Sequence, residues 1–474
     1  MTETNRHDRR IMVDGVEFAS VFRFPKVLRS VTSAMQPPRL VIALLMVVAL
    51  VAVGRAWDAA TDPVISARGL LADDAAAEVI AEDQLFLRQV MAAHGLDRPD
   101  ADAVLTPPAV LERLGGAPAV TPGGADTATR ESLRARLEAL QPIGAYEATA
   151  SAAIASVHQM VRGVLFLRPQ MIYAAGRDLF VGVPVRLWSE TRGFAIGYGL
   201  FLVIILSLGG GAICRMAACE FAGQERLRVR DAVDFALGNW VKLIVTPLLP
   251  LLIATLVAGV LIALGVMLLP WLDVLGGILY GLALLLGFVL AFLLLGYGAA
   301  APLLLPAIAC ENCDAADAQQ RAYAYLLSRP LHLLGYGLVA IAGLALGYVV
   351  IGLVASALLN LTAGLLGVVT DNTALAAAGG FSIFELSPAD TPVDHATGHS
   401  AFAAAAIGFW QRVVVDLAAA YVISYVFTST TIVYLLMRRV CDGQDVEEIW
   451  RPGLTPGTLV PLPRPAVEEA AEEA

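Results

Sequence analysis

Charge is scarce in this sequence. Only 16% of the 474 residues are charged, 58% are hydrophobic, and the mean hydropathy is +0.70. Soluble domains carry about a quarter charged residues, so a soluble globular enzyme is excluded and the surplus apolar side chains are expected to face a lipid bilayer. The net charge of -10 argues against a nucleic-acid partner, because phosphates need a basic face.

Lysine is almost absent, since only Lys26 and Lys242 occur. A P-loop needs Gly-Lys-Ser/Thr, because backbone amides and the lysine together hold the phosphate. Lys26 follows Pro25 and Lys242 follows Val241, which excludes P-loop nucleotide hydrolysis within this chain. The Gly-x-Ser-x-Gly and His-Glu-x-x-His signatures of two hydrolase classes are also missing. The sequence therefore predicts no catalytic residue and no cofactor.

Long apolar stretches predict an all-α integral membrane protein. A helix needs about 20 apolar residues to cross about 30 Å of hydrocarbon. Six stretches qualify, at residues 40–57, 193–214, 243–269, 274–300, 331–358 and 413–437. The first is short, but the long stems of Arg39 and Arg55 can reach the headgroups. The apolar run of the fifth continues to residue 370, so we expect residues 360–370 to form an interfacial or re-entrant piece.

The cores of the six predicted spans contain no Asp, Glu, Lys, Arg or His. Ion-coupled transporters place ionisable groups near the bilayer midplane, so proton-coupled transport is disfavoured. A carrier or channel for lipid or another apolar solute is still compatible with these spans. Arg412 and Asp416 lie at the expected outer mouth of the last span and, four residues apart, are expected to pair.

Basic residues outside the spans predict the orientation. Arg and Lys concentrate before the first span, in the loop 215–242, before the fifth span and in the C-terminal tail. Because basic loops stay in the cytoplasm, both termini are expected there, in a bacterial inner membrane. The arginine bias is typical of a G+C-rich bacterium. The polar leader before the first span is too long for a cleaved signal peptide, which favours an uncleaved anchor.

The spans divide the chain into segments. We expect a cytoplasmic N-terminal segment at 1–39, a mainly helical extracytoplasmic insert at 58–192, a five-helix membrane domain at 193–437 and a disordered acidic tail at 438–474. Within the insert, residues 148–167 are expected to form a helix on the membrane or against the bundle. As a seventh span, that helix would place the arginines of the tail outside.

An amphipathic segment precedes each odd-numbered span. The three lie at residues 18–31, 231–240 and 317–326 and are expected to form helices in the headgroup plane. The pattern indicates three units of surface helix, span and returning span. Two interpretations stay open, a true internal repeat and the ordinary placement of basic turns in any membrane protein.

A family resemblance rests on residues 220–236 and 318–330. The first range reads Glu-Phe-Ala and then Arg-Asp-Ala-Val-Asp-Phe-Ala before a proline-bearing span, and the second enters the next span. These segments resemble uncharacterised six-helix bacterial membrane proteins, which include the YciC-type group and the membrane domain found beside glycerophosphoryl diester phosphodiesterases. The resemblance covers residues 214–437 and implies a helical membrane bundle with no established activity.

The cysteines provide one candidate metal site. Cys310 and Cys313 have the spacing that lets two thiolates bind one tetrahedral ion, and Cys214 and Cys219 would complete four ligands. All of them fall at or near the expected cytoplasmic face, where thiols stay reduced. Cysteines at helix ends also occur simply as small apolar residues, so a structural role stays open.

A second candidate metal site lies in the loop before the sixth span. His395 and His399 are four residues apart, with the carboxylate of Asp394 beside them. Pro392 and Gly398 disfavour a regular helix there, so a solvated polar loop is the alternative.

These observations predict a non-catalytic membrane protein that binds or organises a partner. The expected partners are the lipid bilayer and other membrane proteins, and no nucleic acid. The alternative function is a permease or channel for lipid or another apolar solute, with the last five spans forming the path.

Overall fold

The computed structural model describes residues 24–61, 84–90, 110, 143–223, 226–267, 269, 273–369 and 399–450. Within these ranges the chain forms helices and no strand. Six of the described helices are long and apolar enough to cross a membrane, namely Pro37–Ala60, Arg192–Phe221, Trp240–Val266, Val274–Glu311, Pro330–Gly367 and Ala405–Cys441. The prediction of a helical protein with six membrane-spanning segments is confirmed to this extent.

The chain forms two compact units. Unit 1 comprises Met1–Gln36, Gly211–Gly343 and Tyr425–Ala474, and unit 2 comprises Pro37–Gly210 and Leu344–Ser424. The helices within unit 1 are η1 (Phe24–Leu28), α2 (Arg29–Ser33), α11 (Val229–Gly238), α12 (Trp240–Val266), α13 (Asp273–Glu311) and α14 (Ala315–Ser328). Those within unit 2 are α3 (Pro37–Ala60), α7 (Ala145–Leu165), α8 (Pro169–Arg177), the π-helix η2 (Asp178–Gly182) and α9 (Val183–Glu190). Residues of both units form α10 (Arg192–Phe221), α15 (Pro330–Gly367) and α17 (His399–Cys441).

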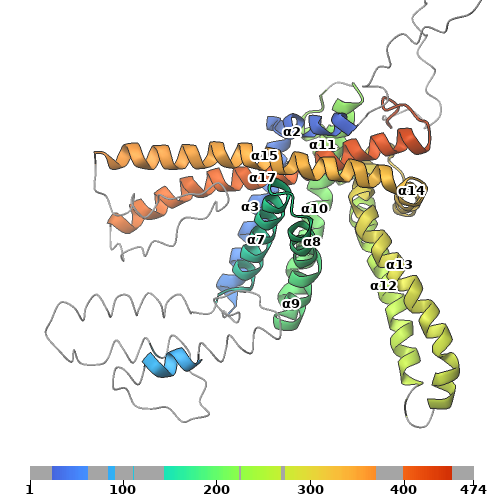
Figure 1. Ribbon diagram of the computed structural model, residues 1–474. Helices are drawn as coiled ribbons and strands as arrows, with labels where there is room; N and C mark the ends of the chain where they lie inside the picture. Colours follow the sequence, from blue (N-terminus) through green and yellow to red (C-terminus); the bar gives the residue numbers. More distant parts are fainter. Residues whose placement is uncertain are drawn as a thin grey trace, which may run out of the picture. The chain divides into compact units, whose positions relative to one another are not determined.

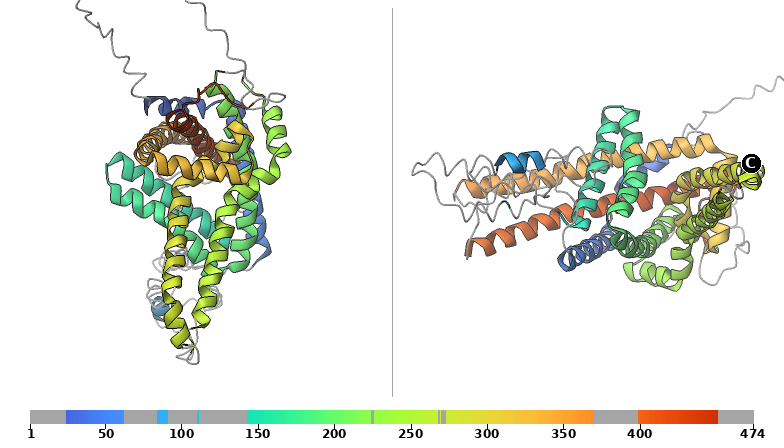
Figure 2. Two further views of the ribbon diagram at one scale, coloured as in Figure 1. Left: turned by 90° about the vertical axis from the view of Figure 1, so that its right-hand side faces the viewer. Right: turned by 90° about the horizontal axis from the view of Figure 1, so that it is seen from below.

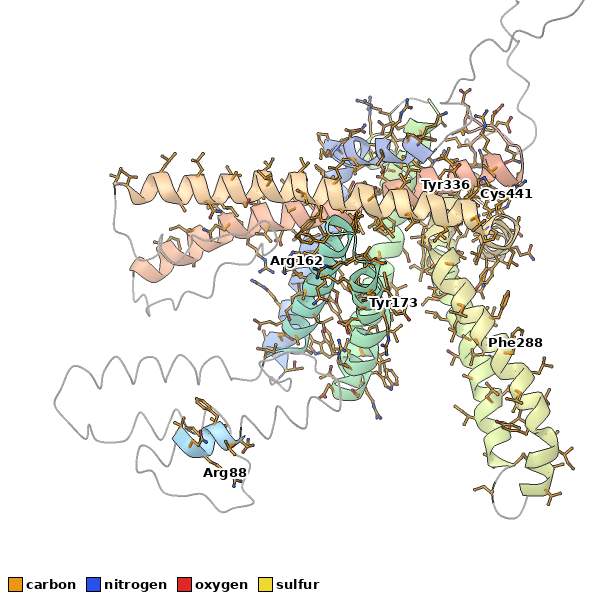
Figure 3. All side chains as sticks on the ribbon, in the orientation of Figure 1. Arg88, Arg162, Tyr173, Phe288, Tyr336 and Cys441 are labelled. Carbon is orange, nitrogen blue, oxygen red and sulfur yellow. The ribbon has the colours of Figure 1, made fainter. Side chains whose placement is uncertain are left out.

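In unit 1, α12 and α13 form a long antiparallel hairpin (Figures 1 and 2). The large side chains on its outer part are exposed, and Phe288 on α13 is 69% exposed (Figure 3). The last turns of α13 differ, because Leu303, Leu304 and Ile308 are buried. Apolar side chains that unit 1 leaves exposed are expected to be covered by lipid, by another part of the same chain or by another protein.

Two short helices of unit 1 share a burial pattern. In α11 the buried residues are Ala232 and Ala236, and in α14 they include Ala318 and Ala322. In each helix the two alanines are four residues apart, so they lie on one face. The second and third expected amphipathic segments thus coincide largely with α11 and α14, whereas the first, at 18–31, is described only from Phe24 onward, as η1 and α2. Their depth relative to a membrane surface remains an expectation.

Unit 2 is built around α7, which packs against α3, α8 and α9. Stacked and edge-to-face aromatic pairs join α3, α7 and α10 through Trp57, Tyr146, Phe194 and Tyr198. A Cβ atom on Gly54 would lie 2.0 Å from the ring of Tyr146, so only glycine allows this close approach. The helix expected at residues 148–167 is present and packs against other helices of its unit.

A side-chain contact joins the two ends of the insert between α3 and α7. Both carboxylate oxygens of Asp58 accept hydrogen bonds from the start of α7, from the backbone N–H of Tyr146 at 2.9 Å and of Glu147 at 3.0 Å. An acidic group there satisfies two N–H groups that lack helical partners and favours the positive end of the helix dipole. Together with the packing of α3 against α7, these bonds hold residues 61 and 143 near each other.

Several predicted boundaries need correction. The first span extends to Pro37–Ala60, and the fourth continues as one helix to Glu311 with Pro302 and Pro306 inside it. The helix α15 runs unbroken through Asn360 to Gly367, so no separate re-entrant piece begins at residue 360. These helices extend beyond their uncharged cores because leucine and alanine also favour helix in the flanking residues. Charged side chains are tolerated at the helix ends, where they can reach water.

The C-terminal boundaries also differ from the predictions. The last long helix begins at His399, within the predicted outer loop, and ends at Cys441. Residues 442–450 belong to unit 1 and are held there by hydrogen bonds, so the tail expected from residue 438 begins no earlier than residue 451, outside the described ranges. The alanine-rich run after His399 explains the early helix start, because alanine has the highest helix propensity. Most of the insert and the residues before Phe24 also lie outside these ranges.

Candidate functional site

A cluster of eight polar side chains, four of them buried, lies in unit 1, where α10, α13 and α17 end. We name it the helix-end cluster, and it comprises Arg215, Glu220, Glu311, Arg321, Tyr325, Tyr434, Arg438 and Asp442. Each of the three helix ends carries a cysteine followed directly by an acidic residue, at 219–220, 310–311 and 441–442. This repeated Cys-acid pair is visible in the sequence and marks the cluster.

Glu311 is the centre of the cluster. Its Oε2 lies 2.5 Å from Nη1 of Arg321, and its Oε1 accepts a 2.5 Å hydrogen bond from the hydroxyl of Tyr434. The same Oε1 lies 3.8 Å from Nη1 of Arg438, a residue that is only 1% exposed. A buried guanidinium needs such partners, because an unpaired charge out of water is strongly destabilising.

The other two acids also connect to short helices. Glu220 accepts hydrogen bonds from the side chains of Ser33, at 3.0 Å, and Gln36, which lie in and just after α2. Asp442 accepts one from the hydroxyl of Tyr325 in α14. Burial first, and then this bond to a carboxylate, raise the pKa of Tyr325, so the phenol stays a neutral donor.

A strap follows α17, and we define it as residues 443–450. It starts at Gly443, whose φ of +70° lies in the left-handed region that glycine adopts without strain. Nη2 of Arg438 donates to the backbone carbonyls of Asp445, at 3.0 Å, and Glu448, at 2.5 Å. The turn at Gly443 thus directs the strap back along the end of its own helix.

The strap ends in a seat formed by Arg215, Phe235 and the backbone of Cys310. Nη2 of Arg215 donates to the carbonyl of Trp450 at 2.8 Å, and the N–H of Trp450 donates to the carbonyl of Cys310 at 2.7 Å. The guanidinium lies 5.2 Å from the ring centre of Phe235 and 5.3 Å from that of Trp450, which is cation–π distance. Nη1 of Arg215 also donates to the carbonyl of Ala309, at 2.9 Å.

The four candidate cysteine ligands lie at the ends of α10 and α13. Cys214, Cys219 and Cys310 are buried, whereas Cys313 is partly exposed. The described part of the chain contains no group of three or more His, Cys, Asp or Glu side chains that could hold a metal ion. Burial, reinforced by the charge of Glu311, raises the pKa of Cys313 to about 11, which opposes the thiolate that a metal needs. We therefore assign these cysteines no ligand.

The histidine candidates fall largely outside the described residues. Asp394 and His395 lie beyond them, and His399 is the first residue of α17 without a described side chain. The proposed metal site there remains a sequence prediction. The pair expected nearby is present, since Nε of Arg412 lies 3.4 Å from Oδ1 of Asp416.

The geometry makes the helix-end cluster a joint between chain segments. Its charged groups bind backbone carbonyls and one another, and they connect three long helices, two short helices and the strap. Such a network fixes relative positions, because each group has a specific partner of opposite charge or polarity.

No family model, no curated protein and no solved structure matches this chain.

Proposed function

We propose that this chain is a multi-pass protein of a bacterial inner membrane that binds and organises another membrane protein. The observation that supports this most is the contrast within unit 1 between a tightly fixed base and an unpartnered apolar hairpin. The most apolar stretch of α13 has a mean hydropathy of 2.8, and none of the residues in this stretch is buried. A rigid base that presents two long apolar helices suits docking within the bilayer, where shape and packing decide association.

The proposed orientation places the helix-end cluster and both termini in the cytoplasm. The loops next to the cluster are those in which arginine and lysine concentrate, and such loops remain on the cytoplasmic side. Exposed side chains of Leu237 and Trp240 near α11, and of Leu327 in α14, are supportive, because they offer apolar contact to the headgroup region.

Purification of the full chain from native membranes in mild detergent tests the proposal. We expect a second membrane protein at constant stoichiometry. We also expect Phe288→Ala together with Phe292→Ala, on the exposed part of α13, to remove it without unfolding the chain. The matched control is Leu327→Ala, an equally exposed apolar residue away from the hairpin, which should retain the partner. A homogeneous protein without a partner would contradict the proposal.

One observation favours the alternative function of a permease. Residues 428–431 of α17 are four consecutive hydroxyl side chains within a membrane-spanning helix, and Thr428 is fully buried with no hydrogen-bond partner for its Oγ1. Buried hydroxyl groups in a span can line a route for polar groups of a solute. Solute or lipid flux in vesicles that contain only this protein, reduced by Thr428→Val, would favour the permease over the scaffold.

A further inference from the structure

Within unit 1 the strap is held by a few specific contacts. Arg438 binds the carbonyls of Asp445 and Glu448, Arg439 lies 3.6 Å from Asp445, and Trp450 is bound in the seat. The strap begins at the left-handed Gly443 and ends at Trp450, and of its residues only Ile449 is buried. Its internal backbone bonds are two short-range turns, from the N–H of Glu448 to Asp445 and from that of Ile449 to Glu447. A segment with few buried contacts and an anchored end opens at lower free energy than the helices around it.

Trp450 is recognised in the way that proteins recognise peptides. Its N–H and its carbonyl are both bound, by Cys310 and by Arg215, while its ring lies beside Phe235 and the guanidinium. Backbone hydrogen bonds supply affinity in such sites and an aromatic pocket supplies selectivity. The three parts of the seat come from α10, α11 and α13, so the site is formed independently of the strap.

The two buried arginines that hold the strap each have a second partner. Arg215 also donates to the carbonyl of Ala309, and Arg438 also pairs with Glu311. Release of the strap therefore leaves neither buried guanidinium without a partner, which lowers the cost of the open state.

We propose that residues 443–450 form a releasable latch and that Arg215, Phe235 and the Cys310 carbonyl form an aromatic-peptide docking site, occupied by the chain's own Trp450. When the latch is closed, Trp450 links α10, α11 and α13 to the chain that follows α17. When the latch opens, the docking site is left unoccupied. The chain continues beyond Trp450 through residues 451–474, so a force or partner acting on that acidic segment acts directly on the latch. This inference is independent of the proposed function, because a scaffold and a permease would each contain such a latch.

Hydrogen exchange of the full chain in lipid nanodiscs tests the latch. In Trp450→Ala we expect the strap amides to exchange at least about tenfold faster, with α14 unchanged, because opening is local. Trp450→Phe should keep most of the protection, since an aromatic ring remains. Trp240→Ala is the matched control, because it removes an exposed tryptophan of the same unit outside the seat.

Two results would overturn the latch. Unchanged exchange in Trp450→Ala would show that Trp450 does not hold the strap, and equal acceleration of strap and α14 would make the strap an integral part of the fold. If Trp450→Ala fails to fold, hydrogen exchange of the strap and of α14 is compared in the unsubstituted protein instead. Its strap amides should exchange at least about tenfold faster than those of α14, and equal protection would refute the proposal.

The docking site is tested separately with a synthetic peptide of residues 444–451 added to Trp450→Ala, or to Trp450→Phe if the alanine variant does not fold. We expect saturable binding that slows exchange around Phe235, and none for the same peptide with alanine in place of tryptophan. Absence of saturable binding at about millimolar peptide, the range of a tethered segment's effective concentration, would refute a docking site.

Discussion

Both ends of α13 are apolar, and yet they occupy opposite environments within unit 1. Leu284, Phe288 and Leu295 in the first part are exposed, whereas Leu304 and Ile308 near the end are fully buried. The buried end is interrupted by Pro302 and Pro306 and contains many alanines, while the exposed part is rich in leucine. Apolar character alone therefore does not distinguish a protein-covered part of a helix from an exposed one, and the alanines of the buried end contribute because small residues allow helices to approach closely.

The largest expected effect is at the buried end, where Glu311→Ala should destabilise the protein by about 3 kcal/mol, because Arg438 loses a buried partner. Denaturant-induced unfolding in detergent measures this. The control is Asp234→Ala, which removes the well-exposed partner of Arg230 and should leave stability unchanged. If both variants unfold alike, the helix-end cluster does not stabilise the fold.

The next effect concerns Cys313, just past the buried end of α13. Since burial raises its thiol pKa to about 11, little thiolate exists at pH 8. We expect alkylation at pH 8 to be about 100-fold slower than for a free thiol of ordinary pKa, because reactivity follows the thiolate. The rate should rise about tenfold per pH unit up to pH 10. A rate that levels off near pH 9 would show an ordinary thiol.

A glycine pair on α13 compares the two parts directly. A Cβ atom on Gly296 would lie 2.5 Å from the ring of Tyr323, whereas one on Gly281 meets nothing within 4 Å. Gly296→Ala should therefore destabilise the protein by about 1–2 kcal/mol through crowding. Gly281→Ala should be neutral or stabilising by up to about 1 kcal/mol, because alanine favours helix. Thermal unfolding in detergent decides, and equal effects would contradict the contrast.

The smallest effect is expected at the exposed end. Leu284→Ala should change the free energy of unfolding of the isolated protein by less than about 0.5 kcal/mol, because no buried contact is lost. The same substitution should weaken association with the proposed partner in a pull-down from native membranes. A large loss of stability without a partner present would mean that the outer hairpin is packed against its own chain.

The sequence predicted the long helices well, because length and hydropathy determine them almost without reference to tertiary contacts. It failed where charged residues continue an apolar helix, as at Arg39 and Glu311. Even there the residue types explain the outcome afterwards, since both charges lie within one or two turns of a helix end and have partners.

The candidate site was less predictable. Cys310 was considered as a metal ligand, yet its backbone carbonyl is what participates, by accepting a hydrogen bond from Trp450. The strap falls within residues 438–474, which the sequence predicts as a disordered acidic tail because prolines and glutamates dominate its end. Its position depends on Arg438, which is near in sequence, and on Arg215, which is far away, and single-sequence patterns carry no information about such long-range contacts.

The bond between Asp58 and the start of α7 has a consequence for how the chain can vary. The Asp58 carboxylate joins the end of α3 to the start of α7, and Gly144 leaves room for it at close range. The packing of these two helices is therefore not expected to depend on the length or sequence of the chain between them. Exchange of residues 62–142 for a foreign domain with adjacent termini is therefore expected to leave the packing of α3 against α7 intact.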